Sequence, residues 1–196
     1  DSASNSTFIL NMAGSSAQTL EIVDELNHVN IDNDSSVTIT NAFDIGTDLT
    51  FEGGWTGTLN IQADMQLMDS TVVFDVPSGG TVEVENGATL DALGGITVSG
   101  TLTISSGSTL LIGNGKSLII NSGGQLNITG VNGNIATLKT TGSGNTYSLT
   151  VNGGISVTYF RVDRLDASGI NVGATGTVDA LNNGEFHSLA ASGVAL

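Results

Sequence analysis

The feature that most constrains this chain is a short alternating phrase that returns at near-constant spacing. In residues 107–130, GSTLLIGNGKSLIINSGGQLNITG, a pair of apolar residues two positions apart recurs every eight residues. The pairs are Leu110/Ile112, Leu118/Ile120 and Leu126/Ile128. Alternation of this kind places both apolar side chains on one face of a short strand. Similar pairs extend from Leu20/Ile22 to Ile170/Val172, and no useful length of the chain has a helical period. The sequence therefore predicts an all-β protein.

The turns between these pairs distinguish two all-β architectures. An antiparallel sandwich favours longer strands and clean two-residue hairpin turns. Here Ser78-Gly79-Gly80, Gly113-Asn114-Gly115 and Ser122-Gly123-Gly124 recur between strands of about five residues, as expected for the corners of a wound coil. Three strands with their corners take up about 24 residues, so we expect Leu102 and Leu126 to stack one coil apart. The prediction is a parallel β-helix (β-solenoid) of roughly eight short coils.

The whole chain, residues 1–196, is predicted to form a single β-solenoid domain with three parts that differ in the regularity of the repeat. Residues 20–130 carry the regular coils. In residues 131–196 the spacing between apolar pairs is less regular, and aromatic residues appear at Tyr147, Tyr159, Phe160 and Phe186. This pattern indicates longer coils with loops. Residues 1–19 contain an apolar, strand-like segment, STFILNMAG, which we expect to lie outside the regular repeat and to pair with its own body or with a neighbouring molecule.

Charge is distributed unevenly and excludes several partners. Residues 1–91 carry 15 Asp and Glu and no Lys or Arg, whereas residues 92–196 carry four of each sign. Such a chain repels nucleic acid and anionic membrane, and no apolar run reaches the roughly 18 residues of a membrane helix. The chain has no cysteine and begins with Asp1 rather than Met, which we interpret as a processed, exported chain or a piece of a longer one. A secreted protein of a bacterial cell surface fits this composition.

Two stretches carry a resemblance to a known group of proteins. They are GNTYSLTVNGGISVTYFRVDRLDASGINVGATGTVDALNNGEFHS, residues 144–188, and TVEVENGATLDALGGITVSGTLTISSGSTLLIGNG, residues 81–115. The chain resembles secreted bacterial right-handed parallel β-helix repeat proteins, which include surface adhesins and autotransporter passengers, over about residues 55–188. The resemblance is one of spacing and residue type. It implies the fold and an extracellular location, and it transfers no catalytic residue.

Two acidic groups are candidate cation sites, with Ca²⁺ as the candidate ion. Asn30, Asp32 and Asp34 supply closely spaced oxygen atoms in HVNIDNDSS, although this segment lacks the glycine and closing glutamate of an EF-hand loop. Glu83 and Glu85 alternate with valines and are expected to point outward from one strand. The plain alternatives are an Asx turn after a strand and a solvated strand face. No other cofactor is predicted.

A second set of residues concerns polysaccharides. Trp55, Tyr147 and Tyr159 are candidate contacts for a glycan, because aromatic rings stack on sugars, but Trp55 could equally plug a corner of the solenoid. The segment RVDRLD, residues 161–166, puts Arg161 and Asp163 on the same side of a strand. A lyase-like site is one interpretation of that pair, and a surface ion pair is the commoner one.

The ends of the predicted solenoid suggest a function. Neither end contains a segment typical of a cap, so the terminal strands would present unpaired backbone groups. We expect Phe8, Ile9 and Leu10 at one end and Val194 and Leu196 at the other to contribute to contacts between copies of the chain. The leading hypothesis is a non-enzymatic structural subunit that joins head to tail, or by strand addition, into a filament or surface layer. The alternatives are an adhesin or passenger fragment that binds glycan or protein on a host or cell surface, and a polysaccharide lyase or hydrolase.

Overall fold

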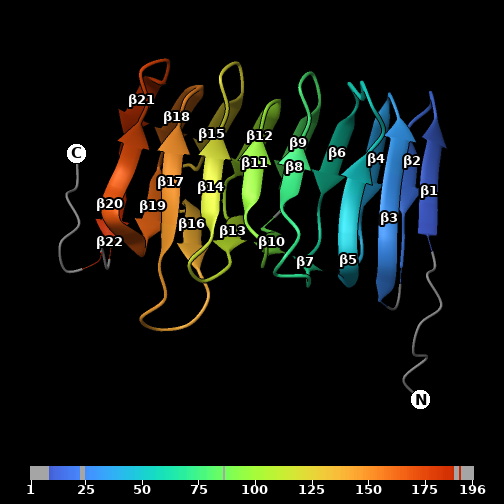
Figure 1. Ribbon diagram of the computed structural model, residues 1–196, viewed down its shortest axis with the longest axis horizontal. Helices are drawn as coiled ribbons and strands as arrows, with labels where there is room; N and C mark the ends of the chain where they lie inside the picture. The colour runs from blue at the N-terminus through green and yellow to red at the C-terminus, as the bar shows by residue number, and fades with distance from the viewer. Residues whose placement is uncertain (1–8, 23–24, 86, 188–189, 191–196) are drawn as a thin grey trace.

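The computed structural model describes residues 9–22, 25–85, 87–187 and 190, and these residues form a β-solenoid of about eight turns. All its elements are strands, and they are arranged in three parallel sheets that wind around one apolar core. Figure 1 shows the strands side by side along a rod, with β1 at one end and β20, β21 and β22 at the other. No described residue lies in a helix, so none lies in a helix that could cross a membrane.

Each sheet collects one strand from successive turns. Sheet A contains β1 (Ile9–Gly14), β3 (Leu26–Asn33), β5 (Phe43–Phe51), β7 (Met65–Leu67), β10 (Thr89–Ala92), β13 (Thr109–Ile112), β16 (Ala136–Thr140), β19 (Phe160–Asp163) and β22 (Glu185–His187). Sheet B contains β2 (Gln18–Leu20), β4 (Ser36–Ile39), β6 (Thr58–Ile61), β9 (Thr81–Val84), β12 (Thr101–Ser105), β15 (Gln125–Thr129), β18 (Gly154–Thr158) and β21 (Thr177–Asn182). Sheet C contains β8 (Phe74–Val76), β11 (Ile96–Val98), β14 (Ser117–Ile120), β17 (Tyr147–Val151) and β20 (Leu165–Val172).

The register confirms the predicted stacking of the apolar pairs. Leu102 of β12 lies opposite Leu126 of β15, and Leu126 lies opposite Ile155 of β18. Each apolar ladder points inward and is almost fully buried, while the Thr, Ser and Asn residues that alternate with it face outward. Because all strands run parallel, the backbone hydrogen bonds of the sheets join neighbouring turns. The core is therefore continuous along the rod.

Glycines occupy the corners for two different reasons. Gly123 has a φ of 84°, a left-handed conformation that glycine adopts without strain. At Gly124 a Cβ atom would collide with the carbonyl oxygen of Val98 in the preceding turn. The corner at Ser122-Gly123-Gly124 thus combines a tight turn with a close approach of backbone from the neighbouring turn.

The first three turns differ from the prediction of uniform three-strand coils over residues 20–130. These turns contain only two named strands each, and β3 and β5 are eight and nine residues long. β5 pairs with β7 through its first residues and with β3 over most of its length, with a register shift between Leu26 and His28. β3 and β5 therefore each take the place of two short strands. The three-strand pattern begins only with β7, β8 and β9.

An aromatic group fills the core where the two arrangements meet. The ring of Trp55 stacks on Phe51 with centroids 4.3 Å apart, and Phe51 lies 5.9 Å from Phe74 of β8. Trp55 is 2% exposed, and its indole N–H donates to the carbonyl oxygen of Asn33 over 2.6 Å. A Cβ atom at Gly80 would collide with this indole ring. Trp55 is thus the corner plug of the sequence analysis, placed at the change in cross-section.

Both ends of the predicted domain are partly described. Residues 9–14 were expected outside the regular repeat, but they form β1 and pair in register with β3, so this segment is the first strand of sheet A. Residues 1–8 lie outside the described residues. After residue 130, β17 pairs with β20 and β18 with β21 through register shifts.

Candidate functional site

The strongest candidate site is a hollow on the outer face of sheet A, over β5, β7 and β10. Its volume is about 450 Å³, and the residues around it are Ala42, Phe43, Asp44, Asp64, Met65, Gln66, Thr89, Asp91 and Leu111. Alternation in the three strands sends Asp44, Gln66 and Asp91 outward on successive turns, where they form one ladder. We call these residues and the space they surround the acidic hollow.

Asp91 is the unusual residue of the acidic hollow. Asp91 is only 9% exposed, and its Oδ2 accepts a hydrogen bond of 2.7 Å from the Gln66 amide. Its Oδ1 is buried and has no hydrogen-bond partner within the described structure. A buried carboxylate oxygen without a partner is costly, because water no longer solvates its charge. Such atoms in folded proteins call for an explanation.

Burial raises the pKa of the Asp91 carboxyl above its usual range. The hydrogen bond from Gln66 opposes this shift, since it stabilises the carboxylate, and the negative charge of Asp44 adds to it. Asp64 differs from Asp91: it is exposed, and its Oδ1 accepts the backbone N–H of Thr89 over 2.7 Å. The hollow therefore holds two exposed carboxyl groups and one nearly buried one.

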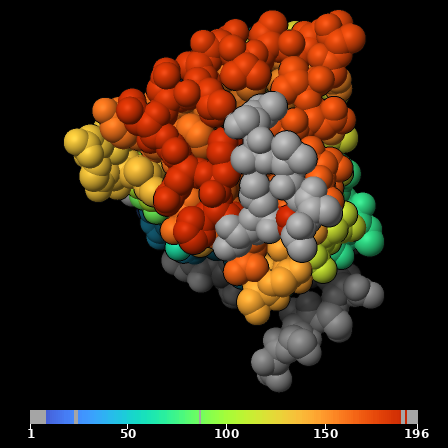
Figure 2. Space-filling model, turned by 90° about the vertical axis from the view of Figure 1, so that its left-hand side faces the viewer, coloured from blue at the N-terminus to red at the C-terminus, as the bar shows by residue number. Residues whose placement is uncertain are grey.

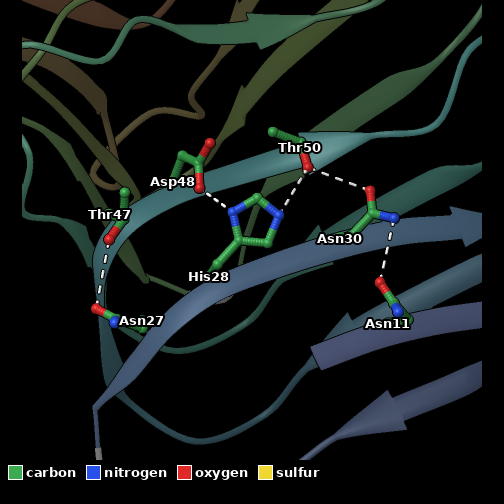
Figure 3. Close-up of polar contacts among 7 residues, drawn as sticks. All are labelled: Asn11, Asn27, His28, Asn30, Thr47, Asp48 and Thr50. Carbon is green, nitrogen blue, oxygen red and sulfur yellow. Dashed lines mark hydrogen bonds and ion pairs between the residues drawn. The ribbon is translucent and has the colours of Figure 1, made fainter. Parts of the chain in front are cut away.

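A second group of polar side chains lies on β1, β3 and β5, the first three strands of sheet A (Figure 3). His28 Nδ1 pairs with Asp48 Oδ1, and His28 Nε2 lies 3.3 Å from Thr50 Oγ1. Thr50 donates to Asn30 Oδ1 over 3.1 Å, and the Asn30 amide donates to Asn11 Oδ1 over 3.2 Å. These five residues, which we call the His28 row, bind successive turns to one another across the surface.

The order carboxylate, imidazole, hydroxyl in the His28 row is also that of a nucleophilic triad. If the Nδ1–H of a neutral His28 donates to Asp48, Nε2 carries no proton and must accept a hydrogen bond from the Thr50 hydroxyl. Thr50 has one proton, and the Asn30 carbonyl oxygen competes for it at a shorter distance than His28 Nε2. We therefore interpret the row as a structural tie between turns.

The residues predicted to bind a cation are placed apart from the acidic hollow. Asp32 and Asp34 are exposed around the end of β3, while the intervening Asn33 is fully buried and bonds to Ser16 and Gln18. Asn30 belongs to the His28 row and also donates to Glu52 over 2.6 Å. Within the residues described, no three or more His, Cys, Asp or Glu side chains converge closely enough to hold a metal ion.

The second predicted pair, Glu83 and Glu85, points outward from β9 as expected. Glu83 accepts a hydrogen bond from Ser105 over 3.2 Å, and Glu85 accepts one from Gln62 over 2.7 Å. Glu83 thus bonds to the following turn and Glu85 to the preceding turn. Their predicted role as cation ligands stays a prediction.

The aromatic residues predicted to contact a glycan are mostly inside the protein. Trp55 and Tyr147 are buried at 2% and 1% exposure, so their rings are unavailable for stacking on a sugar, and both expectations are wrong for this structure. Burial also raises the pKa of Tyr147 well above its usual range, with a further contribution from Asp163. Tyr159 is half-buried and has a φ of 45°, which places it at a corner.

The other predicted residues that the structure describes lie in the first and last turns. Ile9 is 51% exposed and Leu10 is half-buried, both on β1, while Phe8, Val194 and Leu196 lie outside the described residues. Arg161 lies on the same side of β19 as Asp163, as predicted, and the two side chains pair at 3.3 Å. Arg161 is also 3.9 Å from Glu185, which makes it part of an ion-pair group on the last two turns.

The sequence analysis missed the residues that matter most at the surface. Asp91 stands between Leu90 and Ala92, and the same alternation that identified the apolar pair places it outward in the ladder of Asp44 and Gln66. The pairing of His28 with Asp48 depends on a spacing of 20 residues between turns, which is shorter than the predicted coil. The register of β3 with β5 reveals the pairing of His28 with Asp48, and the register of β5, β7 and β10 reveals the ladder of Asp91.

Comparison with known proteins adds no family to this description. No protein-family model, no curated protein and no solved structure matches the chain. The class of protein is thus defined by its architecture alone: a parallel β-solenoid with an acidic first half.

Proposed function

We propose that this protein is an extracellular structural subunit whose solenoids join end to end into a filament or surface layer. The single observation that supports the proposal is the state of the last turn. Val178 and Leu181 of β21 continue the inward ladders of Ile155 and Val157, yet they are 43% and 39% exposed. One turn earlier, Ile155 and Val157 are only 3% and 2% exposed.

Within the described residues, the turn that contains β21 thus leaves core side chains in contact with solvent. Figure 2 looks onto this end, where orange and red atoms of the final strands are visible. Among the described strands, β20, β21 and β22 each pair on one side only. Strands with a free edge and exposed apolar side chains are sites at which another chain can add.

A second copy of the same chain is the occupant that fits this end. At the opposite end, β1 and β2 also pair on one side only among the described strands, and they run in the same direction as the rest of the solenoid. β2 of one copy can thus follow β21 of another as the next parallel strand of sheet B. The end that contains β21 is only the less acidic of the two, because the last turns carry Arg161 and Arg164 together with four carboxyl groups, whereas residues 1–91 have no Lys or Arg. Such a head-to-tail contact does not close and produces a filament.

The test compares two lysine substitutions on β21. Val178→Lys puts a charge into the exposed end of the core, and we expect it to abolish assembly. Thr177→Lys adds the same charge on the outward side of the same strand and should leave assembly intact. Negative-stain imaging and light scattering across a range of concentrations provide the measurement. A wild-type protein that remains monomeric at every concentration, or an equal loss in both variants, contradicts the proposal.

A further inference from the structure

We propose that Asn132 is a site of spontaneous covalent modification, at which the backbone nitrogen of Gly133 displaces ammonia from the Asn132 side chain and an aspartyl or isoaspartyl residue results. Asn132 and Gly133 form the tip of a turn between β15 and β16, and residues 131–135 are all exposed. Two backbone hydrogen bonds between Val131 and Asn134, of 2.9 and 3.1 Å, close this turn. The turn lies away from both ends of the rod, so the inference is independent of end-to-end assembly.

The reaction needs only the chain itself, a base and water. Base removes the proton of the Gly133 amide, and the nitrogen attacks Asn132 Cγ, so that a C–N bond forms and the Cγ–Nδ2 bond breaks. Nδ2 takes up a proton and leaves as ammonia, and a five-membered cyclic imide remains. Water then opens the imide: attack at Cγ produces aspartate, and attack at the main-chain carbonyl carbon produces isoaspartate. Glycine favours the first step because it has no side chain beside the attacking nitrogen.

The chain contains five Asn-Gly pairs, and in three of them the glycine nitrogen already has a hydrogen-bond partner. The pairs begin at Asn86, Asn114, Asn132, Asn152 and Asn183. The bonded amides are those of Gly87, which donates to the Ser108 hydroxyl over 3.2 Å, of Gly115, which donates to the Thr146 carbonyl over 2.8 Å, and of Gly153, which donates to the Ile120 carbonyl over 3.2 Å. Each of these bonds joins two successive turns. The solenoid must therefore open locally before any of the three nitrogens can attack.

The Gly133 nitrogen has no such restraint. Neither its N–H nor the Asn132 side-chain amide has a hydrogen-bond partner among the residues that the structure describes. A Cβ atom built at Gly133 would meet no other atom within 4 Å, so the surrounding space is open. Rotation of this backbone toward the cyclic imide loosens one exposed turn and breaks no bond between turns of the solenoid.

The pair Asn183-Gly184 is restrained by packing instead. The Gly184 N–H has no backbone partner in the described structure, but a Cβ atom at Gly184 would collide with the ring of Phe160. Phe160 is 2% exposed, and Asn183 has a φ of 53°. Rotation of this backbone displaces a buried ring. The structure thus separates Asn132 from the other four asparagines, although all five precede a glycine.

The product changes the charge of a long stretch of the rod. Residues 92–162 contain no Asp or Glu, and their charged residues are Lys116, Lys139 and Arg161. Conversion of Asn132 introduces the first carboxylate of this stretch. Because the turn is exposed, water solvates the new charge and the apolar core is not disturbed.

Incubation of the full-length protein in mildly alkaline buffer, followed by proteolysis and tandem mass spectrometry, tests the proposal. In the folded protein we expect Asn132 to convert at least about tenfold faster than Asn114 and Asn152, because their glycine amides must first break a hydrogen bond and open the solenoid. In guanidinium chloride these restraints are absent, and the three rates should converge to within about threefold. The difference between the two conditions measures the contribution of the fold.

Two controls belong to the same turn. Gly133→Ala places a methyl group beside the attacking nitrogen and should remove most of the conversion at Asn132 without changing the rates at Asn114 and Asn152. Asn134 is equally exposed but precedes Ile135, and it should remain unmodified. Equal rates at Asn132 and Asn152 in the folded protein, faster conversion at Asn183 than at Asn132, or an Asn132 that reacts only in the denatured chain would each overturn the proposal.

Discussion

The first three turns and the last five turns of this solenoid solve the same packing problem in two ways. In the first section, β1 to β6, each turn has two strands, and the long strands β3 and β5 bend so that one strand covers two sides. In the second section, from β7 onward, three short strands and glycine corners form each turn. The second section repeats closely, whereas the first is held by particular side chains, namely the His28 row and the Trp55 plug.

The boundary between the two sections is visible as an interruption of hydrogen bonding. Among the described strands, β8 pairs with β11 alone, and the part of β5 that follows Asp48 pairs only with β3. A hollow of about 190 Å³ lies there, between the end of β5 and residues 72–77. In Figure 1 the two strands are neighbours on the near side of the rod. Aromatic packing therefore replaces a backbone ladder at this boundary.

The largest expected effect is at the plug. Trp55→Ala removes a large buried ring between the two sections and should lower the free energy of unfolding by about 3–5 kcal/mol. Because turns of a solenoid contact mainly their neighbours, the loss should concentrate near the boundary. Hydrogen exchange should show a greater loss of protection in β4 and β6 than in β15. Equal loss along the whole rod would mean that the boundary is not a distinct structural unit.

A pair of substitutions at one corner tests the regular section. Gly124→Ala places a methyl group against the Val98 carbonyl of the preceding turn, and we expect a loss of about 2–3 kcal/mol. Gly123→Ala in the same corner meets no atom within 4 Å, so only its left-handed backbone is unfavourable, at about 1 kcal/mol. Urea denaturation followed by circular dichroism measures both. A larger cost at Gly123 would contradict the close approach of successive turns.

The acidic hollow lies at the beginning of the regular section and is expected to reduce stability there. Since burial raises the folded-state pKa of Asp91, its charged form opposes folding at neutral pH. Asp91→Asn should therefore be more stable than wild type at pH 7, by on the order of 1 kcal/mol. The advantage should shrink as pH falls through the folded-state pKa and vanish below the unfolded value, about 4. Thermal melts between pH 3 and 8 measure it, and an advantage independent of pH would contradict this explanation.

The smallest effects concern polar contacts on the surfaces of the two sections. Asn30→Ala breaks bonds to three other side chains in the first section and should cost about 1 kcal/mol. Arg161→Ala removes partly exposed ion pairs from the second section and should cost less than about 0.5 kcal/mol. The order of the two losses in urea denaturation is the result that matters. The reverse order would indicate that the first section does not depend on its polar row.

The same contrast explains how much could be predicted from the sequence. The apolar pairs repeat every eight residues between Leu102 and Ile128 of the second section, so alternation alone predicts the stacking of Leu102 on Leu126. In the first section one strand spans two sides, and the spacing between apolar pairs does not reveal where it bends. The burial of Trp55 depends on Phe51 and Gly80, which the fold brings together from different turns. Asp91 was overlooked because its neighbours fit the apolar pattern, and only the register with Gln66 shows its place in a ladder.

The most direct test of the central claim, that one solenoid continues into the next, uses engineered cysteines. The chain has no cysteine of its own. Thr19 of β2 and Ala180 of β21 occupy the same outward ladder of sheet B in the first and last turns. In a continuous filament they would be about 4.8 Å apart between copies, within the range that a disulfide bridges.

The Thr19→Cys, Ala180→Cys double variant is oxidised and resolved on a non-reducing gel. End-to-end stacking predicts a ladder of multimers that collapses on reduction, while either single variant gives dimers at most. Thr97→Cys combined with Ala180→Cys, which moves one thiol to the middle of sheet C, should form no ladder. Monomers alone from the first double variant, or the same products from both double variants, would contradict end-to-end continuation of the solenoid.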